Sequence, residues 1–147
     1  WAEAELGSVE EGIEKMQHGL AAYEATGAQL WSSYSLELLA DQLAKAGQLE
    51  AAIAALNKAL TYAEHSGEKF SLSELQRLKG ELLMKSFKRE SVASRPKVTT
   101  ESGVGTDCKL IRAQRCFENA LDIAQQQEAR SWEVKARASI ERLARVN

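Results

Sequence analysis

Few residues of this sequence have the types and the spacing that chemistry at a protein site requires. His18 and His65 have no cysteine or carboxylate around them at the spacing of metal ligands, so we interpret them as solvated helix or turn residues rather than ligands. Cys116 precedes Phe117, which favours packing as a small apolar residue over a role as a catalytic thiol. No glycine-rich phosphate loop opens a helix. The sequence therefore predicts a chain that is not an enzyme and that uses no metal or cofactor.

The composition argues against two classes of partner. The chain of 147 residues has a formal net charge of −2, so it has no bulk positive field to attract nucleic acid or an anionic membrane. No apolar run approaches the roughly 18–20 residues that cross a bilayer. Ala, Leu, Glu, Gln, Lys and Arg dominate and there is one proline, a mixture that favours helix. We therefore expect a helical chain whose partners are proteins or peptides.

The two cysteines, Cys108 and Cys116, bear on the compartment. If both lie on one helix they are about 12 Å apart, because each helical residue rises 1.5 Å. A disulfide needs Cα atoms within roughly 7 Å, so these two cannot pair with each other. We interpret them as reduced thiols and the location as cytoplasmic. Because the sequence starts at Trp1 without Met, we expect it to be part of a longer protein.

Four glycines recur at a constant spacing of 20 residues: Gly7, Gly27, Gly47 and Gly67. Each follows an apolar-periodic segment and precedes polar residues. Glycine just past a helix end supplies the left-handed conformation that terminates the helix. The spacing therefore predicts helices joined by short turns, with two helices in each unit of 40 residues.

The apolar periodicity predicts six full helices, at about 8–26, 29–46, 49–66, 69–87, 108–126 and 130–146. The predicted fold is an all-α solenoid of antiparallel helix pairs that forms a single domain over 1–147. The segment 88–107 breaks the period, contains the only proline and is rich in Ser, Thr and Gly. We interpret it as a disordered insertion, with a phosphorylated or partner-docking tail as the alternative.

The repeats resemble the tetratricopeptide repeat. Small residues seven apart surround a large one in Ala52–Leu56–Ala59 and Ala113–Phe117–Ala120, and Leu36–Leu39–Ala40–Leu43 follows the pattern of the first helix. The period of 40, against about 34 in the family, and the missing family proline make this a divergent variant. Glu74–Leu83 and Ser131–Ala136 are also similar to the C-terminal repeat region of bacterial proteins that join a class III nucleotide cyclase domain to a predicted ATPase domain. The cyclase and ATPase residues of such proteins have no counterpart here.

The resemblance implies a concave groove lined by the first helix of each pair. Its predicted partner-binding side chains are Tyr34, Glu37, Asp41, Arg77, Glu81 and Lys85, with Lys45, Glu74, Lys135, Arg142 and Arg145 at equivalent positions. Their charge changes from acidic to basic along the groove, which suits an extended peptide or a charged helix. The alternative is a solvated face with ion pairs such as Glu37 or Asp41 with Arg77. If the groove binds a partner, reversing Arg77 and Lys85 to Glu should weaken binding with little change in melting temperature.

Trp31 and Trp132 open equivalent helices, and we favour packing wedges over a ligand-stacking role. The predicted function is a protein-interaction, sensor or scaffold module within a larger signalling protein. The alternative is a structural spacer or self-association module, which makes a homo-oligomer possible. An enzyme is the least favoured of the three hypotheses.

Overall fold

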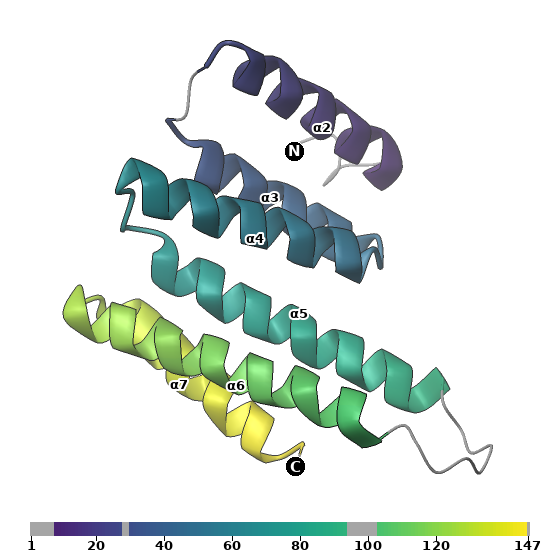
Figure 1. Ribbon diagram of the computed structural model, residues 1–147, viewed down its shortest axis with the longest axis vertical. Helices are drawn as coiled ribbons and strands as arrows, with labels where there is room; N and C mark the ends of the chain where they lie inside the picture. Colours follow the sequence, from purple (N-terminus) through teal and green to yellow (C-terminus); the bar gives the residue numbers. More distant parts are fainter. Residues whose placement is uncertain (1–7, 28–29, 94–102, 147) are drawn as a thin grey trace. The chain divides into compact units, whose positions relative to one another are not determined.

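The computed structural model describes residues 8–27, 30–93 and 103–146, and this part of the chain is helical with no strand (Figure 1). Its six helices are α2 (Val9–Ala25), α3 (Ser32–Lys45), α4 (Leu49–Ser66), α5 (Leu72–Ala93), α6 (Gly103–Gln126) and α7 (Arg130–Ala144). The predicted all-α class is confirmed. No helix among the described residues is long and apolar enough to cross a membrane.

The turn glycines have the predicted conformation. Gly27, Gly47 and Gly67 all have positive φ, at 75°, 77° and 73°, which a side chain would disfavour. Gly7 lies outside the described residues. In the turn between α6 and α7 the left-handed position falls on Glu128, with φ 55°. This last turn therefore places a residue with a side chain where the others use glycine.

Helices enter both ends of the segment 88–107, which the sequence predicts as a disordered insertion. Helix α5 continues through Ala93 and α6 begins at Gly103, so only residues 94–102 of this segment lie outside the described part. Contacts between the two helices explain the extension. Lys109 Nζ donates to Ser86 Oγ at 2.9 Å and also pairs with Glu90. Helix α6 therefore gives the added turns of α5 a partner, which a local sequence pattern does not reveal.

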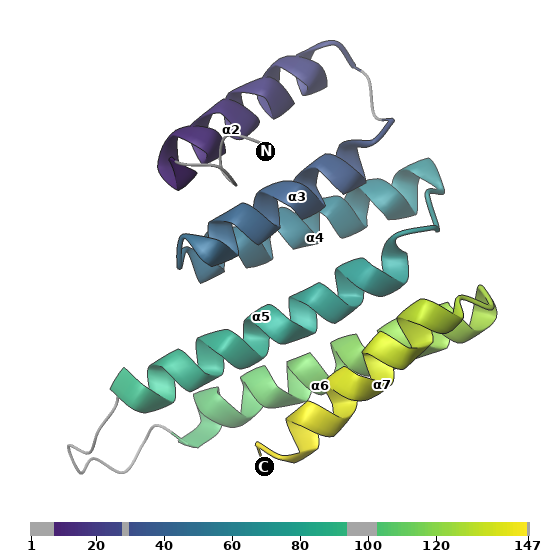
Figure 2. The ribbon, with the colours of Figure 1, turned by 180° about the vertical axis from the view of Figure 1, so that it is seen from behind.

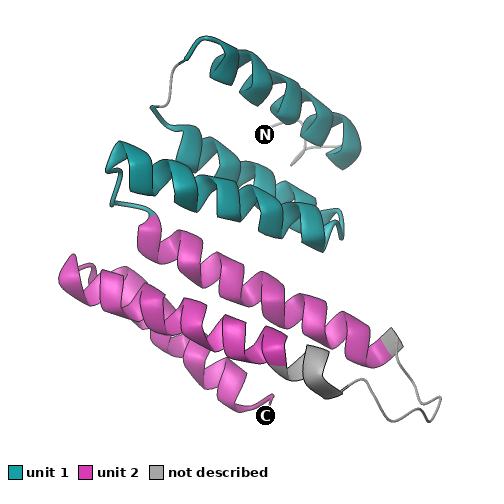
Figure 3. Cartoon of the chain, in the orientation of Figure 1, with its two compact units in different colours: residues 1–71 teal, residues 72–147 magenta. Residues whose placement is uncertain are grey.

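The chain divides into two compact units, residues 1–71 and 72–147 (Figure 3). The first unit contains α2, α3 and α4, with α3 and α4 packed side by side and α2 in contact with α3 (Figure 2). Its core includes the fully buried Leu36, Leu43 and Leu56. The single array that the sequence predicts over 1–147 stays a prediction beyond these two units.

In the second unit, α5 packs along α6, and α7 contacts both of them. Phe117 lies at the centre with no exposed surface, and Ala113 and Ala120 on either side of it are equally buried. The small–large–small pattern of this helix is therefore a core pattern. The hydroxyl of the buried Ser73 donates to the Ala120 carbonyl at 2.8 Å, which ties α5 to α6. This packing fixes α5 and α7 side by side and so positions the charged residues described next.

Candidate binding surfaces

The predicted groove residues of the second unit lie on one stripe of α5. Arg77 holds both oxygens of Glu74, with Nε to Oε2 and Nη2 to Oε1 each at 2.8 Å. Its Nη1 also lies 3.5 Å from Glu81 Oε1. The Arg77 side chain is only 15% exposed. Its guanidinium is therefore fixed between two carboxylates of its own helix.

Helix α7 adds three polar side chains to this stripe. Ser139 Oγ, on a fully buried residue, donates to Glu81 Oε1 at 2.7 Å. Arg142 also pairs with Glu81, and Lys135 Nζ lies 3.5 Å from Glu74 Oε1. We call the set formed by Glu74, Arg77, Glu81, Lys135, Ser139 and Arg142 the charge network. It joins α5 to α7 through side chains that satisfy one another.

The positive charges of the network lower the pKa of the Glu74 carboxyl. Burial alone would raise the pKa of this carboxyl, because it disfavours the charged form. The hydrogen bonds and the positive charge of Arg77, together with Lys135, outweigh burial and hold the pKa below its ordinary value of 4.5. Glu74 is therefore ionised at neutral pH and stabilises the positions of its two basic partners.

The charge network modifies the predicted groove in this unit. Arg77 and Glu81 are half-buried and engaged, whereas Lys85 is exposed at the next turn of the same stripe. The basic residues expected to give α7 its charge, Lys135 and Arg142, pair with the acids of α5. The predicted drift from acidic to basic is therefore partly neutralised between the helices, and Lys85 is the predicted groove residue of α5 that stays exposed.

The other three predicted residues lie on α3 in the first unit. Tyr34 is 44% exposed, and Asp41 pairs with Lys45 at 2.9 Å along its own helix. Glu37 is half-buried between them. The pairing that the structure gives to Asp41 is local, within α3. The six predicted residues thus form two triplets, one on α3 and one on α5.

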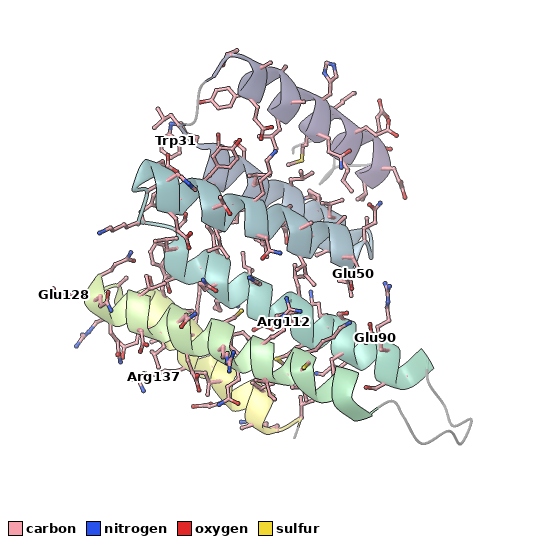
Figure 4. All side chains as sticks on the ribbon, in the orientation of Figure 1. Trp31, Glu50, Glu90, Arg112, Glu128 and Arg137 are labelled. Carbon is pink, nitrogen blue, oxygen red and sulfur yellow. The ribbon has the colours of Figure 1, made fainter. Side chains whose placement is uncertain are left out.

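An exposed cluster of aromatic rings, which was not predicted from the sequence, lies at the N-terminal end of α3. The rings of Trp31 and Tyr34 have centroids 6.4 Å apart and cross at 75°, and those of Trp31 and Phe70 are 6.2 Å apart at 69°. Trp31 is 56% and Phe70 49% exposed, so Trp31 is not the buried wedge that the sequence favoured (Figure 4). Trp132, its repeat equivalent, is half-buried. We call Trp31, Tyr34 and Phe70 the aromatic cluster.

A carboxylate holds Trp31 in an unusual backbone conformation. Trp31 has φ 65° and ψ 7°, a left-handed geometry that is rare for a bulky residue. Its N–H donates to Glu68 Oε1 at 3.3 Å, and Ser33 Oγ donates to Glu68 Oε2 at 2.5 Å. Glu68 therefore bridges the residues on either side of the start of α3. The three-residue spacing of Trp31 and Tyr34 was the only sequence signal for this cluster, because Phe70 reaches it through the fold.

The two cysteines and His65 are among the described side chains that could take part in covalent chemistry or metal binding. Both cysteines lie on α6 as free thiols, and burial raises the pKa of the Cys116 thiol despite the positive charges of Lys79 and Arg112. The thiolate form of Cys116 is therefore disfavoured at neutral pH. His65 Nδ1 lies 2.7 Å from the Thr61 carbonyl. Within 8–27, 30–93 and 103–146, no group of three or more His, Cys, Asp or Glu residues is placed to hold a metal ion.

Comparisons with known proteins add no assignment to these surfaces. No protein-family model matches the sequence, and no curated protein matches it either.

Proposed function

We propose that this chain is a protein-interaction module whose helices form a tetratricopeptide-like solenoid and present charged faces to a partner protein. The repeat of 20 residues between left-handed turn glycines and the small–large–small core pattern support the solenoid. By its resemblance to the repeat regions of cyclase and ATPase proteins, the module would serve as a sensor or scaffold within a larger signalling protein.

The charge network is the observation that carries this proposal. Its side chains come from two helices and are held by mutual hydrogen bonds, so they lose little further freedom when a partner binds. Lys135 of the network is 54% exposed despite its contact with Glu74, and Lys85 is exposed at the next turn of α5. Exposed charges at the rim of an interface steer association and fix orientation more than they set affinity. A partner with an acidic segment fits this face best.

Site-specific photo-crosslinking tests the proposal in cells that express the chain. A photoreactive phenylalanine analogue replaces Lys85 or Lys135 in turn, and it replaces Arg115 on the exposed face of α6 as the matched control. We expect the same protein adduct from positions 85 and 135 and none from position 115. Adducts from all three positions, or from position 115 alone, would reject the α5–α7 face as the binding surface.

Self-association is the second candidate, and exposed apolar residues favour it. Val134 on α7 is 67% exposed and Ile111 on α6 is 51% exposed. Contact between copies of the chain would bury such residues. Light scattering on the chain and on Val134→Lys separates the candidates. A dimer of the original chain that becomes a monomer in Val134→Lys would support self-association. A monomer at all concentrations would reject self-association and leave partner binding as the remaining candidate.

A further inference from the structure

The aromatic cluster has the chemistry of a receptor for a flat cation. Trp31 crosses both Tyr34 and Phe70 at steep angles, and all three rings are at least 44% exposed. The negative face of an aromatic ring attracts a cation, and tryptophan does so most strongly. The Glu68 carboxylate lies beside this surface, within hydrogen-bond distance of the Trp31 N–H. Aromatic rings and a carboxylate are thus combined at the start of α3.

We propose that the aromatic cluster and Glu68 bind an arginine side chain of the partner protein, which stacks on Trp31 and donates hydrogen bonds to Glu68. This inference rests on the proposed partner-binding function and names one anchor of that partner. The predicted groove residue Tyr34 belongs to the cluster, so the anchor would lie at one end of the α3 face. Charge complementarity identifies the occupant, because Glu68 places a carboxylate beside the exposed rings of the aromatic cluster.

Arginine fits this surface better than lysine does. Its guanidinium is planar, is weakly hydrated and carries five N–H donors, so it stacks on an aromatic ring and binds a carboxylate at the same time. Among the described residues, Glu68 Oε1 accepts from the Trp31 N–H and Oε2 accepts from the Ser33 hydroxyl, and a carboxylate oxygen can accept a second hydrogen bond. A lysine ammonium is a compact charge that cannot stack in this way.

The backbone of Trp31 supplies an independent reason to assign a function to this ring. Left-handed φ is unfavourable for a residue with a bulky side chain, and such residues concentrate at functional sites. Glycine occupies the left-handed position just after α2, α3 and α4, at Gly27, Gly47 and Gly67. A tryptophan that is strained and also largely exposed contributes little to the core. A contact of this ring with another molecule would give the strained position a function.

Titration of the full chain with short peptides tests the arginine site. The probes are three otherwise identical Gly/Ser peptides that carry one arginine, one lysine or one citrulline, the neutral isostere of arginine. The readout is the NMR signal of the Trp31 indole N–H, assigned by its loss in Trp31→Gly. We expect the arginine peptide to shift this signal and to bind at least about fivefold more tightly than the citrulline peptide, in line with one cation–π contact and one charged hydrogen bond.

Three variants distinguish a loss of arginine binding at this site from a general loss of the fold. Trp31→Gly removes the ring and relieves the left-handed strain, so it should fold and yet lose arginine binding, as followed by the Tyr34 and Phe70 ring signals. Glu68→Gln keeps an acceptor for the Trp31 N–H and should weaken binding about fivefold. Trp132→Ala is the matched control in the second unit and should bind as the original chain does.

Equal binding of arginine and citrulline peptides, or normal binding by Trp31→Gly, would overturn the arginine site. Equal binding of lysine would overturn the choice of arginine. These outcomes are independent of the crosslinking at Lys85 and Lys135. If the arginine site fails while those positions still capture one partner, the proposed function stands and only the anchor is wrong. If positions 85 and 135 capture no common partner, the α5–α7 face is rejected as the binding surface, whatever the result at the arginine site.

Discussion

Gly80 on α5 lies directly against the ring of Phe117 on α6. A Cβ atom added at Gly80 would lie 2.5 Å from Cε1 and 2.8 Å from Cδ1 of that ring, far inside van der Waals contact. Phe117 is fully buried. The absence of a side chain at position 80 therefore sets how closely α5 and α6 approach. This approach in turn places the α5 stripe that carries the charge network.

Gly80→Ala should destabilise the second unit although alanine is the better helix former. Overpacking costs about 1–3 kcal/mol, which exceeds the gain of about 1 kcal/mol in helix propensity. We expect urea unfolding followed by circular dichroism to show a net loss of about 1 kcal/mol. Phe117→Leu in the same chain should restore part of that loss, because it removes the ring atoms that clash. Strictly additive effects of the two changes would show that the residues are not coupled.

The turn at Glu128 offers a stabilising substitution. Glu128 is exposed and has φ 55°, the conformation that glycine adopts in the three other turns. Glu128→Gly should raise the free energy of unfolding by about 0.5–1 kcal/mol. Gly47→Ala, the reverse change at φ 77°, should lower it by about 1 kcal/mol. A loss of stability in Glu128→Gly would mean that its side chain matters more than its backbone.

The pKa of Glu74 predicts how acid affects the second unit. Because the folded pKa lies below 4.5, the Glu74 contacts stabilise the fold above that pH, and this stabilisation is lost as pH falls through the folded value. Glu74→Gln should lower the free energy of unfolding at pH 7 by about 1–2 kcal/mol. The difference from the original chain should shrink below pH 4.5.

Urea titrations of both chains between pH 7 and pH 2.5 measure this effect. Glu14→Gln on the exposed side of α2 is the control and should leave stability at pH 7 unchanged. A difference between Glu74→Gln and the original chain that persists unchanged into strong acid would contradict the assignment.

The helices and their turns could be predicted from the sequence because the signals are local. Apolar periodicity within one helix and glycine after it located α2, α3, α4 and α7 to within about three residues, whereas α5 ends six residues later and α6 begins five residues earlier than predicted. The charge network could not be predicted, because it requires α7 to lie beside α5 and acids of one helix to meet bases of the other. The role of Glu68 was hidden for a similar reason, since 35 residues separate it from Ser33.

The structure also changes one expected experiment. Sequence analysis predicted that reversing Arg77 and Lys85 together would weaken binding with little effect on melting. Arg77 is bidentate to Glu74 and close to Glu81, so a third carboxylate at position 77 should lower the melting temperature by itself. Lys85 is exposed and is the better position for a charge reversal.

The affinity of the crosslinked partner for Lys85→Glu tests the central claim most directly. Isothermal calorimetry at low salt compares the original chain with Lys85→Glu and with Arg115→Glu. The two variants make the same charge change, one on α5 and the other on the exposed side of α6. The account predicts that Lys85→Glu weakens binding by about tenfold, or about 1.4 kcal/mol, with an unchanged melting temperature, and that Arg115→Glu binds normally. Equal affinities of the two variants would contradict the claim that the α5–α7 face binds the partner.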